Sequence, residues 1–274
     1  MFATELSIFH ALILGIVEGI TEFLPVSSTG HLLVVGDLIG FGTGANQSAA
    51  DTYSIAIQFG AIVAVLFLYR DRIASMVNGV FGRSVEGRNA LTRLIIAFLP
   101  AAVLGVVAGD ALKDALFGPI PVTIAWCIGG VLLLRFTPVE GSLHIQTLPI
   151  RAAFIIGVAQ GVALWPGVSR SLITLVAGLA VGLSMAAAIE FSFLLGLVTL
   201  SAATFLDMAK HGGELVDTFG YVSPLVGLIA AFITAVIAVK WMVGYLSKHS
   251  LAIFGYYRIA VAGVAAVLLL AGVL

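Results

Sequence analysis

The sequence predicts an all-α integral membrane protein built as an inverted repeat, with six transmembrane helices and two re-entrant helix-loop-helix hairpins. Of its 274 residues, 61% are hydrophobic and 10% are charged, whereas soluble domains are about half apolar and a quarter charged. The mean hydropathy is +1.16. Long apolar stretches alternate with apolar regions that polar turns interrupt, and the two halves of the chain resemble each other.

Six apolar stretches are long enough to cross about 30 Å of hydrocarbon, which takes roughly 20 helical residues. They are residues 51–70, 90–109, 119–136, 186–208, 221–246 and 252–273.

Two further apolar regions, residues 6–40 and 150–183, are broken midway by PVSST and by WPGVSRS. Neither half of such a region is long enough to span. Irregular backbone at membrane depth is tolerated only where protein or a water-filled cavity satisfies its amides. Each region is therefore expected to be a hairpin that enters and leaves the bilayer by one face.

The positive charges provide an independent test of this topology, because cytoplasmic loops collect Lys and Arg. Of the 13 basic residues, ten fall on or near one face, Lys113 and Lys210 fall on the other, and Arg170 lies inside the second hairpin. The first hairpin and both termini are therefore expected to face outward. The ends of the second hairpin are expected in the cytoplasm.

An internal repeat appears when the sequence is shifted by 142 residues, which aligns residues 15–40 with residues 157–182. Five glycine and serine positions coincide, Val26 meets Val168, and Glu18 meets Gln160. A single membrane domain, residues 1–274, would thus contain two repeats, about 1–140 and 141–274. Each repeat has one hairpin and three crossings, so the repeats point in opposite directions and the hairpin tips meet near the midplane, as in many transporters.

The first hairpin carries two acids, Glu18 and Glu22, which share a helix face because they are four residues apart. Ionisable groups at membrane depth are costly and are candidates for function. Two close carboxylates share a proton or a cation. Glu22 could instead cap the helix or satisfy the loop.

Hydroxyl groups follow these acids at Ser27, Ser28 and Thr29, where the second short helix begins. One of them suffices as a helix cap, and exposed amides at a helix start attract anions. A serine beside a base is also an established nucleophile. His31 could act as a general acid or orient a phosphate, or it could be a hydrogen-bonded structural residue.

The second turn supplies Arg170 between Ser169 and Ser171. The forked guanidinium of arginine matches phosphate or carboxylate oxygens in a two-point contact. Arg170 could also form an ion pair with Glu18 or Glu22, and the two interpretations are compatible.

Three other positions have simpler expectations. Arg258 is a candidate for the site, but it lies near a helix end, so its side chain is expected to extend toward water. Glu190 could pair with a basic loop residue or contribute to the site. Gly129 and Gly130 are expected at a close helix contact.

The net charge of −1 and the absence of a basic cluster in the sequence exclude a nucleic-acid partner. The expected partners are membrane lipids.

Several long motifs give the chain a family resemblance: EGITEFLPVSSTGH (18–31), ALWPGVSRSLIT (163–174), AIEFSFLL (188–195), Asp207 and IFGYYR (253–258). The chain resembles bacterial undecaprenyl-diphosphate phosphatases of the bacitracin-resistance type. The resemblance implies hydrolysis of undecaprenyl diphosphate to undecaprenyl phosphate and inorganic phosphate, which recycles the lipid carrier of peptidoglycan synthesis. It also implies the bacterial inner membrane, a site on the periplasmic side and a homodimer.

The resemblance further implies residue roles, and a Mg²⁺ or Ca²⁺ ion at Glu18 and Glu22. The implied catalytic residues are Glu18, Glu22, Ser28, His31 and Arg170, and the implied substrate-binding residues are Ser27, Thr29, Ser169, Ser171 and Thr174. Leu172 follows Ser171 where many members have glycine. Whether Ser28 or a water molecule attacks the phosphorus is left open.

A different class of function, a transporter or flippase for a small anion or a polyprenyl phosphate, also fits inverted repeats with broken helices. A carrier needs an anion site. It has little use for a serine beside paired carboxylates and a histidine.

Overall fold

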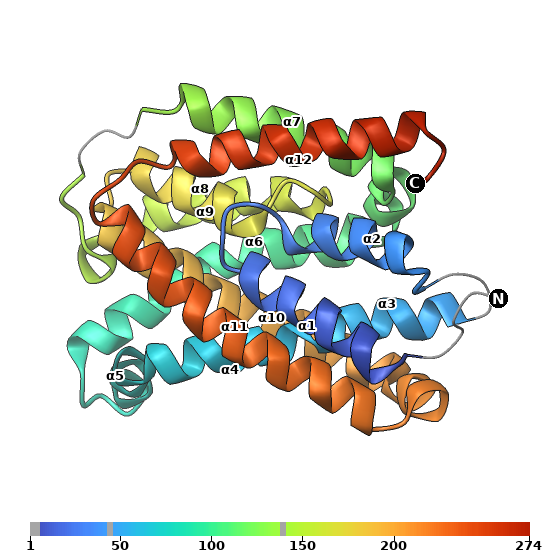
Figure 1. The fold of residues 1–274 in the computed structure, drawn as a ribbon. Coiled ribbons are helices and arrows are strands. Elements are labelled where there is room, and N and C mark those ends of the chain that lie inside the picture. Colours follow the sequence, from blue (N-terminus) through green and yellow to red (C-terminus); the bar gives the residue numbers. More distant parts are fainter. Residues whose placement is uncertain (1–5, 43–45, 138–140) are drawn as a thin grey trace.

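A computed structural model describes residues 6–42, 46–137 and 141–274 (Figure 1). Over these residues the secondary structure is helical, and the strand-like pairing is limited to an isolated bridge between Leu143 and Leu183. The all-α prediction is therefore confirmed. The first helix begins, and the last helix ends, at the same end of the molecule (Figure 1).

Five apolar helical segments of the described chain have 19 to 35 residues, enough to cross a bilayer. The protein is therefore a multi-pass membrane protein. The predicted span 119–136 is a helix of 17 residues, at the lower end of the length that can cross. The predicted spans correspond to α3 (Gln47–Ala56) with α4 (Gln58–Leu68), α6 (Val85–Leu116), α7 (Pro119–Arg135), α10 (Met185–Phe219), α11 (Val222–Leu246) and α12 (Ala252–Leu270).

The two interrupted regions each form a helical hairpin. The first consists of α1 (Ile8–Thr21) and α2 (Ser28–Ile39), and the second of α8 (Ile150–Gln160), a short 3₁₀ helix η3 (Gly161–Leu164) and α9 (Arg170–Ala180). Both turns lie in the middle of the molecule, and the hairpins extend from them toward opposite ends (Figure 1). Their depth in a bilayer and their origin as inverted repeats stay predictions.

Glycines let the first helix of each hairpin pack closely on a neighbour. A Cβ added to Gly15 would collide with the backbone of Gly227 on α11, and one added to Gly157 would collide with the backbone of Ala97 on α6. Small residues at helix contacts are how membrane helices approach each other closely. The matching glycines thus fix each hairpin against a different long helix.

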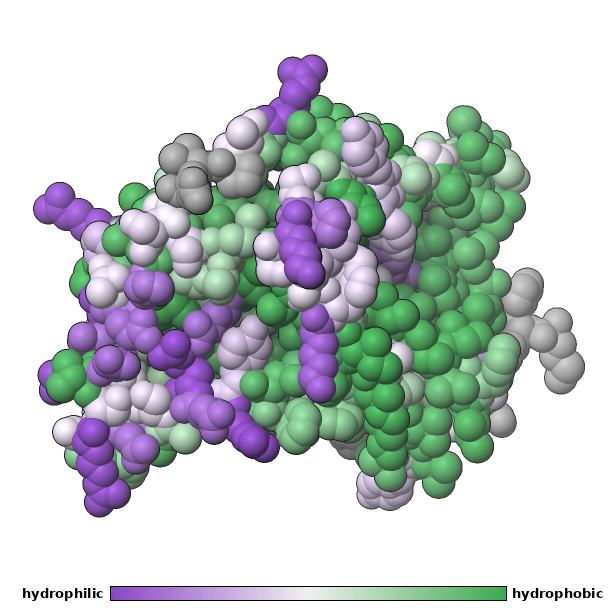
Figure 2. All heavy atoms as spheres, turned by 60° about the vertical axis from the view of Figure 1, so that its left-hand side comes forward, coloured by the Kyte–Doolittle hydropathy of each residue, from purple (hydrophilic) through white to green (hydrophobic). Residues whose placement is uncertain are grey.

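The outer surface divides by polarity. With the end that carries α5 (Arg70–Val80) turned forward, hydrophilic residues cover the left of the view and hydrophobic residues cover the flank on the right (Figure 2). Many large apolar side chains of the long helices are exposed, for example Val106 at 83% and Ile237 at 63%. An apolar flank of this kind is the surface that lipid chains solvate.

Candidate active site

The two turns have the same unusual backbone at equivalent positions. Ser27 (φ 72°) and Ser169 (φ 77°) are the non-glycine residues with positive φ in the described ranges. Each caps the helix that follows, because Ser27 Oγ accepts from the amide of Gly30 and Ser169 Oγ accepts from the amide of Leu172. A strained backbone costs about 1–3 kcal/mol and persists where surrounding contacts enforce it, often at functional sites.

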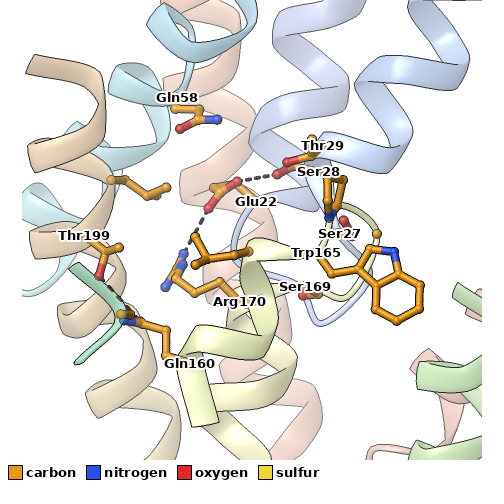
Figure 3. A pocket seen from close by; sticks show the side chains of 16 residues that line it. Glu22, Ser27, Ser28, Thr29, Gln58, Gln160, Trp165, Ser169, Arg170 and Thr199 are labelled. Atoms are coloured by element: carbon orange, nitrogen blue, oxygen red, sulfur yellow. Dashed lines mark hydrogen bonds and ion pairs between the residues drawn. The ribbon is translucent and has the colours of Figure 1, made fainter. Parts of the chain in front are cut away.

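One carboxylate links the two turns. Ser28 Oγ donates a hydrogen bond to Glu22 Oε2, and Arg170 Nη2 donates to Glu22 Oε1 at 2.9 Å (Figure 3). The side chains of Arg170 and Glu22 are only 11% and 6% exposed. The structure therefore brings together a hydroxyl and an acid of the first hairpin and the arginine of the second, as the sequence predicts.

These side chains line a cavity of about 190 Å³ (Figure 3). Six of the predicted site residues face it: Glu22, Ser27, Ser28, Thr29, Ser169 and Arg170. The remaining polar lining comes from Gln58, Gln160, Trp165 and Thr199.

Arg170 is held in place from several sides. Its Nη1 donates to the carbonyl of Ser192 at 2.9 Å, and its guanidinium lies over the ring of Phe23 at 5.5 Å from the centroid. Gly196 of α10 leaves the space that the guanidinium occupies, because a Cβ there would overlap it. Arg170 Nε has no hydrogen-bond partner, so the guanidinium, called the clamp below, keeps one free donor.

His31 lies behind the turn and does not line the cavity. Its Nδ1 is 2.7 Å from the carbonyl of Ser27, and its Nε2 is 2.8 Å from the hydroxyl of Tyr257. A carbonyl can only accept, so Nδ1 carries a hydrogen, and in the neutral ring Nε2 accepts from Tyr257. In this geometry His31 holds the strained Ser27 backbone. Its role as a general acid stays a prediction.

Three other predicted residues lie outside the cavity lining. Glu18, one helical turn before Glu22, is fully buried, and neither carboxylate oxygen has a hydrogen-bond partner. Ser171 Oγ donates to the carbonyl of Leu24 at 2.8 Å, which ties the second hairpin to the first turn. Thr174 Oγ1 lies 2.7 Å from the hydroxyl of Ser192.

The prediction that Arg258 extends toward water is wrong. Its side chain is fully buried and donates to the carbonyls of Pro25, Ala125 and Gly167 at 3.3, 2.9 and 2.8 Å. Pro25 and Gly167 belong to the two turns, whose carbonyls lack helical partners and need donors at this depth. Arg258 therefore fastens both turns to α7. Gly129 of α7 leaves room for the guanidinium, because a Cβ there would overlap it.

Comparison with known proteins identifies the family of the chain. Residues 11–264 match the family described as bacitracin resistance protein BacA. The chain belongs to the BacA bacitracin resistance family. It is 44% identical over 259 residues to an undecaprenyl-diphosphatase of Sorangium cellulosum. This alignment covers 92% of this chain and 83% of that protein. It is also 44% identical to undecaprenyl-diphosphatase 1 of Chromobacterium violaceum, over 92% of this chain and 93% of the relative.

Some residues of this BacA family site had only weak signals in the sequence. Gln160 stands opposite Glu18 in the repeat alignment, and Gln58 begins α4 after a break at Ile57 that hydropathy does not mark. Tyr257 lies within IFGYYR, but nothing local to it indicates a contact with His31.

Outside the cavity, Glu190 forms an ion pair with Arg72, with Arg72 Nε 2.5 Å from Glu190 Oε1. Pairing with a basic residue is the first of the two roles expected for Glu190. Leu172 is buried, and its amide donates to Ser169 Oγ, the cap of its helix.

The carboxylates near the cavity suit a Mg²⁺ ion that is held partly by the substrate. In the ranges that the structure describes, no group of three or more His, Cys, Asp or Glu side chains converges, so a cage built from protein alone is not formed there. Mg²⁺ is commonly held by one or two carboxylates together with substrate phosphate oxygens and water. Glu22 lines the cavity, and its Oε1 becomes free for a cation when Arg170 moves from it to a substrate phosphate. Glu18, whose oxygens have no partner, lies behind Glu22 and outside the lining.

Proposed function

We propose that this chain hydrolyses undecaprenyl diphosphate to undecaprenyl phosphate and inorganic phosphate, which recycles the lipid carrier for peptidoglycan synthesis and confers bacitracin resistance. The observation that supports this most directly is the buried chain Ser28–Glu22–Arg170, which joins the two hairpins at one cavity. Phosphoryl transfer depends mainly on positioning and charge stabilisation, and these three groups supply a nucleophile, a base and an anion clamp.

The membrane location follows from the substrate. A C55 tail stays in hydrocarbon, because removing it would cost about 0.8 kcal/mol for each CH₂. We propose the bacterial inner membrane, with the cavity opening on the periplasmic side. The chain is also proposed to form a homodimer, which light scattering of the detergent-solubilised protein would test.

In the proposed reaction, the diphosphate displaces the Glu22 carboxylate from Arg170, and the guanidinium donors and the amides at the start of α2 hold its oxygens. Ser28 Oγ attacks the terminal phosphorus while its proton passes to Glu22, to which it is already hydrogen bonded. The bond from this phosphorus to the bridging oxygen breaks, and the lipid monophosphate leaves. Water then hydrolyses the phosphoserine and releases inorganic phosphate.

A divalent cation, when bound by Glu22 and Glu18, would neutralise charge on the phosphate oxygens. Glu22 then has two tasks, because it also accepts the proton of Ser28. Direct attack by water is the competing route, in which Glu22 would activate the water and Ser28 would only position the phosphate.

The experiment is phosphate release from undecaprenyl diphosphate by the purified protein in detergent. Arg170→Ala is expected to abolish turnover under either route. Ser28→Ala abolishes it only if the serine is the nucleophile, so near-normal turnover of that variant would leave the water route. Ser247→Ala, on an exposed residue outside the cavity lining, is the matched control. A pure wild-type protein that binds the lipid without releasing phosphate would instead support the transporter class.

A further inference from the structure

A second buried group in the cavity has no assigned task. Gln160, the last residue of α8, is 2% exposed and lines the cavity. Its Nε2 has no hydrogen-bond partner, and its Oε1 has a single long contact, 3.5 Å from Thr199 Oγ1. The single proton of Thr199 Oγ1 is donated to the carbonyl of Leu195 at 2.8 Å. Burying an amide donor without a hydrogen-bond partner is unfavourable. We therefore expect a group of a bound ligand to accept a hydrogen bond from Gln160 Nε2.

The position of Gln160 indicates which ligand group that is. Figure 3 shows Ser28, Glu22, Arg170 and Gln160 in sequence across the cavity, with Gln160 farthest from Ser28. The apolar part of the cavity lining includes Ala101, Leu164 and Leu200. A lipid diphosphate whose terminal phosphorus lies at Ser28 would therefore place its lipid-bearing phosphate near the amide. Its first isoprene units would lie on the apolar wall.

The repeat alignment adds a second argument. Gln160 stands at the position that Glu18 occupies in the first hairpin, and both side chains are buried with unpartnered polar atoms. An ionised carboxylate can only accept hydrogen bonds, whereas an amide also donates two. The first hairpin thus presents acceptors for a proton or cation, and the second presents a donor for an anion.

We propose that Gln160 Nε2 donates a hydrogen bond to the lipid-bearing phosphate of the substrate, and so makes the site selective for a diphosphate over a monophosphate. This inference rests on the proposed function and adds a substrate-binding residue to it. The donor also stabilises the charge that this phosphate gains when it leaves. After hydrolysis the same contact holds the monophosphate product until the lipid moves out.

Gln160→Met tests this, because methionine keeps the length of the side chain and removes the amide. We expect kcat/KM for undecaprenyl diphosphate to fall by about 10- to 100-fold, as for one hydrogen bond to a charged group. We also expect the inhibition constant of methylenediphosphonate to rise by about tenfold or more. Inhibition by inorganic phosphate, which occupies the terminal position alone, should change less than twofold. Gln47→Leu, an exposed glutamine on α3, is the control.

The outcomes are distinct. If Gln160→Met weakened inhibition by methylenediphosphonate and by inorganic phosphate equally, or changed neither, the inference would be overturned. The proposed function is tested separately, by phosphate release from undecaprenyl diphosphate by the wild-type protein. Gln160→Glu is the second variant, and it is expected to be weaker than Gln160→Met because a carboxylate repels phosphate. If Gln160→Glu instead matched the wild type and needed less divalent cation, the side-chain oxygen would be a cation ligand and the inference would be wrong. An unchanged melting temperature for either variant would show that folding is not the cause.

Discussion

Gly196 is the most informative single position for testing the clamp, because it touches Arg170 without belonging to the reacting groups. A Cβ at Gly196 would overlap Nη1, Cζ and Nη2 of Arg170. Gly196 lies inside the 35-residue helix α10, whose backbone cannot retreat easily. In Gly196→Ala the guanidinium must therefore move.

The expected loss follows from the contacts of that guanidinium. It donates to the Ser192 carbonyl and to Glu22, both at 2.9 Å, and two such donors would serve the phosphate. Each hydrogen bond to a charged group is worth about 1.5–3 kcal/mol, so displacing both costs about 3–6 kcal/mol. At 1.36 kcal/mol for each factor of ten, kcat/KM should fall by about two to four orders of magnitude.

The assay is phosphate release from undecaprenyl diphosphate in detergent, with the melting temperature measured in parallel. Gly244→Ala on α11 is the matched control, since nothing lies within 4 Å of a Cβ there. It should keep full activity and gain up to about 1 kcal/mol of stability from the better helix propensity of alanine. If Gly196→Ala kept activity within threefold of the wild type, the guanidinium would not need its observed position, and the clamp would be refuted.

Other predictions concern the turns, the cation and the ion pair between Arg72 and Glu190. Arg258→Lys should lower the melting temperature by several degrees, because an ammonium lacks the forked reach to the separate turn carbonyls of Pro25 and Gly167 and each one left unpaired costs about 1–3 kcal/mol; an unchanged transition in differential scanning fluorimetry would contradict the fastening role. Chelation should reduce phosphate release at least about tenfold and added Mg²⁺ should restore it, with Glu22→Gln needing more cation than the wild type; full activity after exhaustive chelation would remove the cation from the proposal. Glu190→Gln should keep kcat within twofold and lose about 1 kcal/mol or less, because its pair with Arg72 is partly exposed at 20% and 28%; a large loss of kcat without a change in melting temperature would move Glu190 into the site.

The helical fold and the meeting of the turns could be predicted because their causes are visible along the chain. Hydropathy marks the long helices, and the 142-residue alignment pairs Ser27 with Ser169, which share positive φ angles in the structure. An arginine at membrane depth needs an anionic partner, and Glu22 provides it.

The partners of Arg258 could not be predicted in the same way. They are backbone carbonyls of residues 25, 125 and 167, and a carbonyl has no signature in the sequence because every residue carries one. A position near a helix end therefore favoured the wrong prediction. The break between α3 and α4 at Ile57 was missed for a similar reason, since the residues around it are as apolar as those of an unbroken span.

The carbonyl contacts of Arg258 also affect what can enter the cavity. In the part of the chain that the structure describes, no carboxylate pairs with this guanidinium, so its positive charge is solvated by dipoles and not cancelled. Coulomb interactions are strong in a medium of low dielectric constant. The protein therefore keeps a positive charge beside the two turns, which favours the approach of an anionic polyprenyl diphosphate and gives an uncharged polyprenol no comparable advantage.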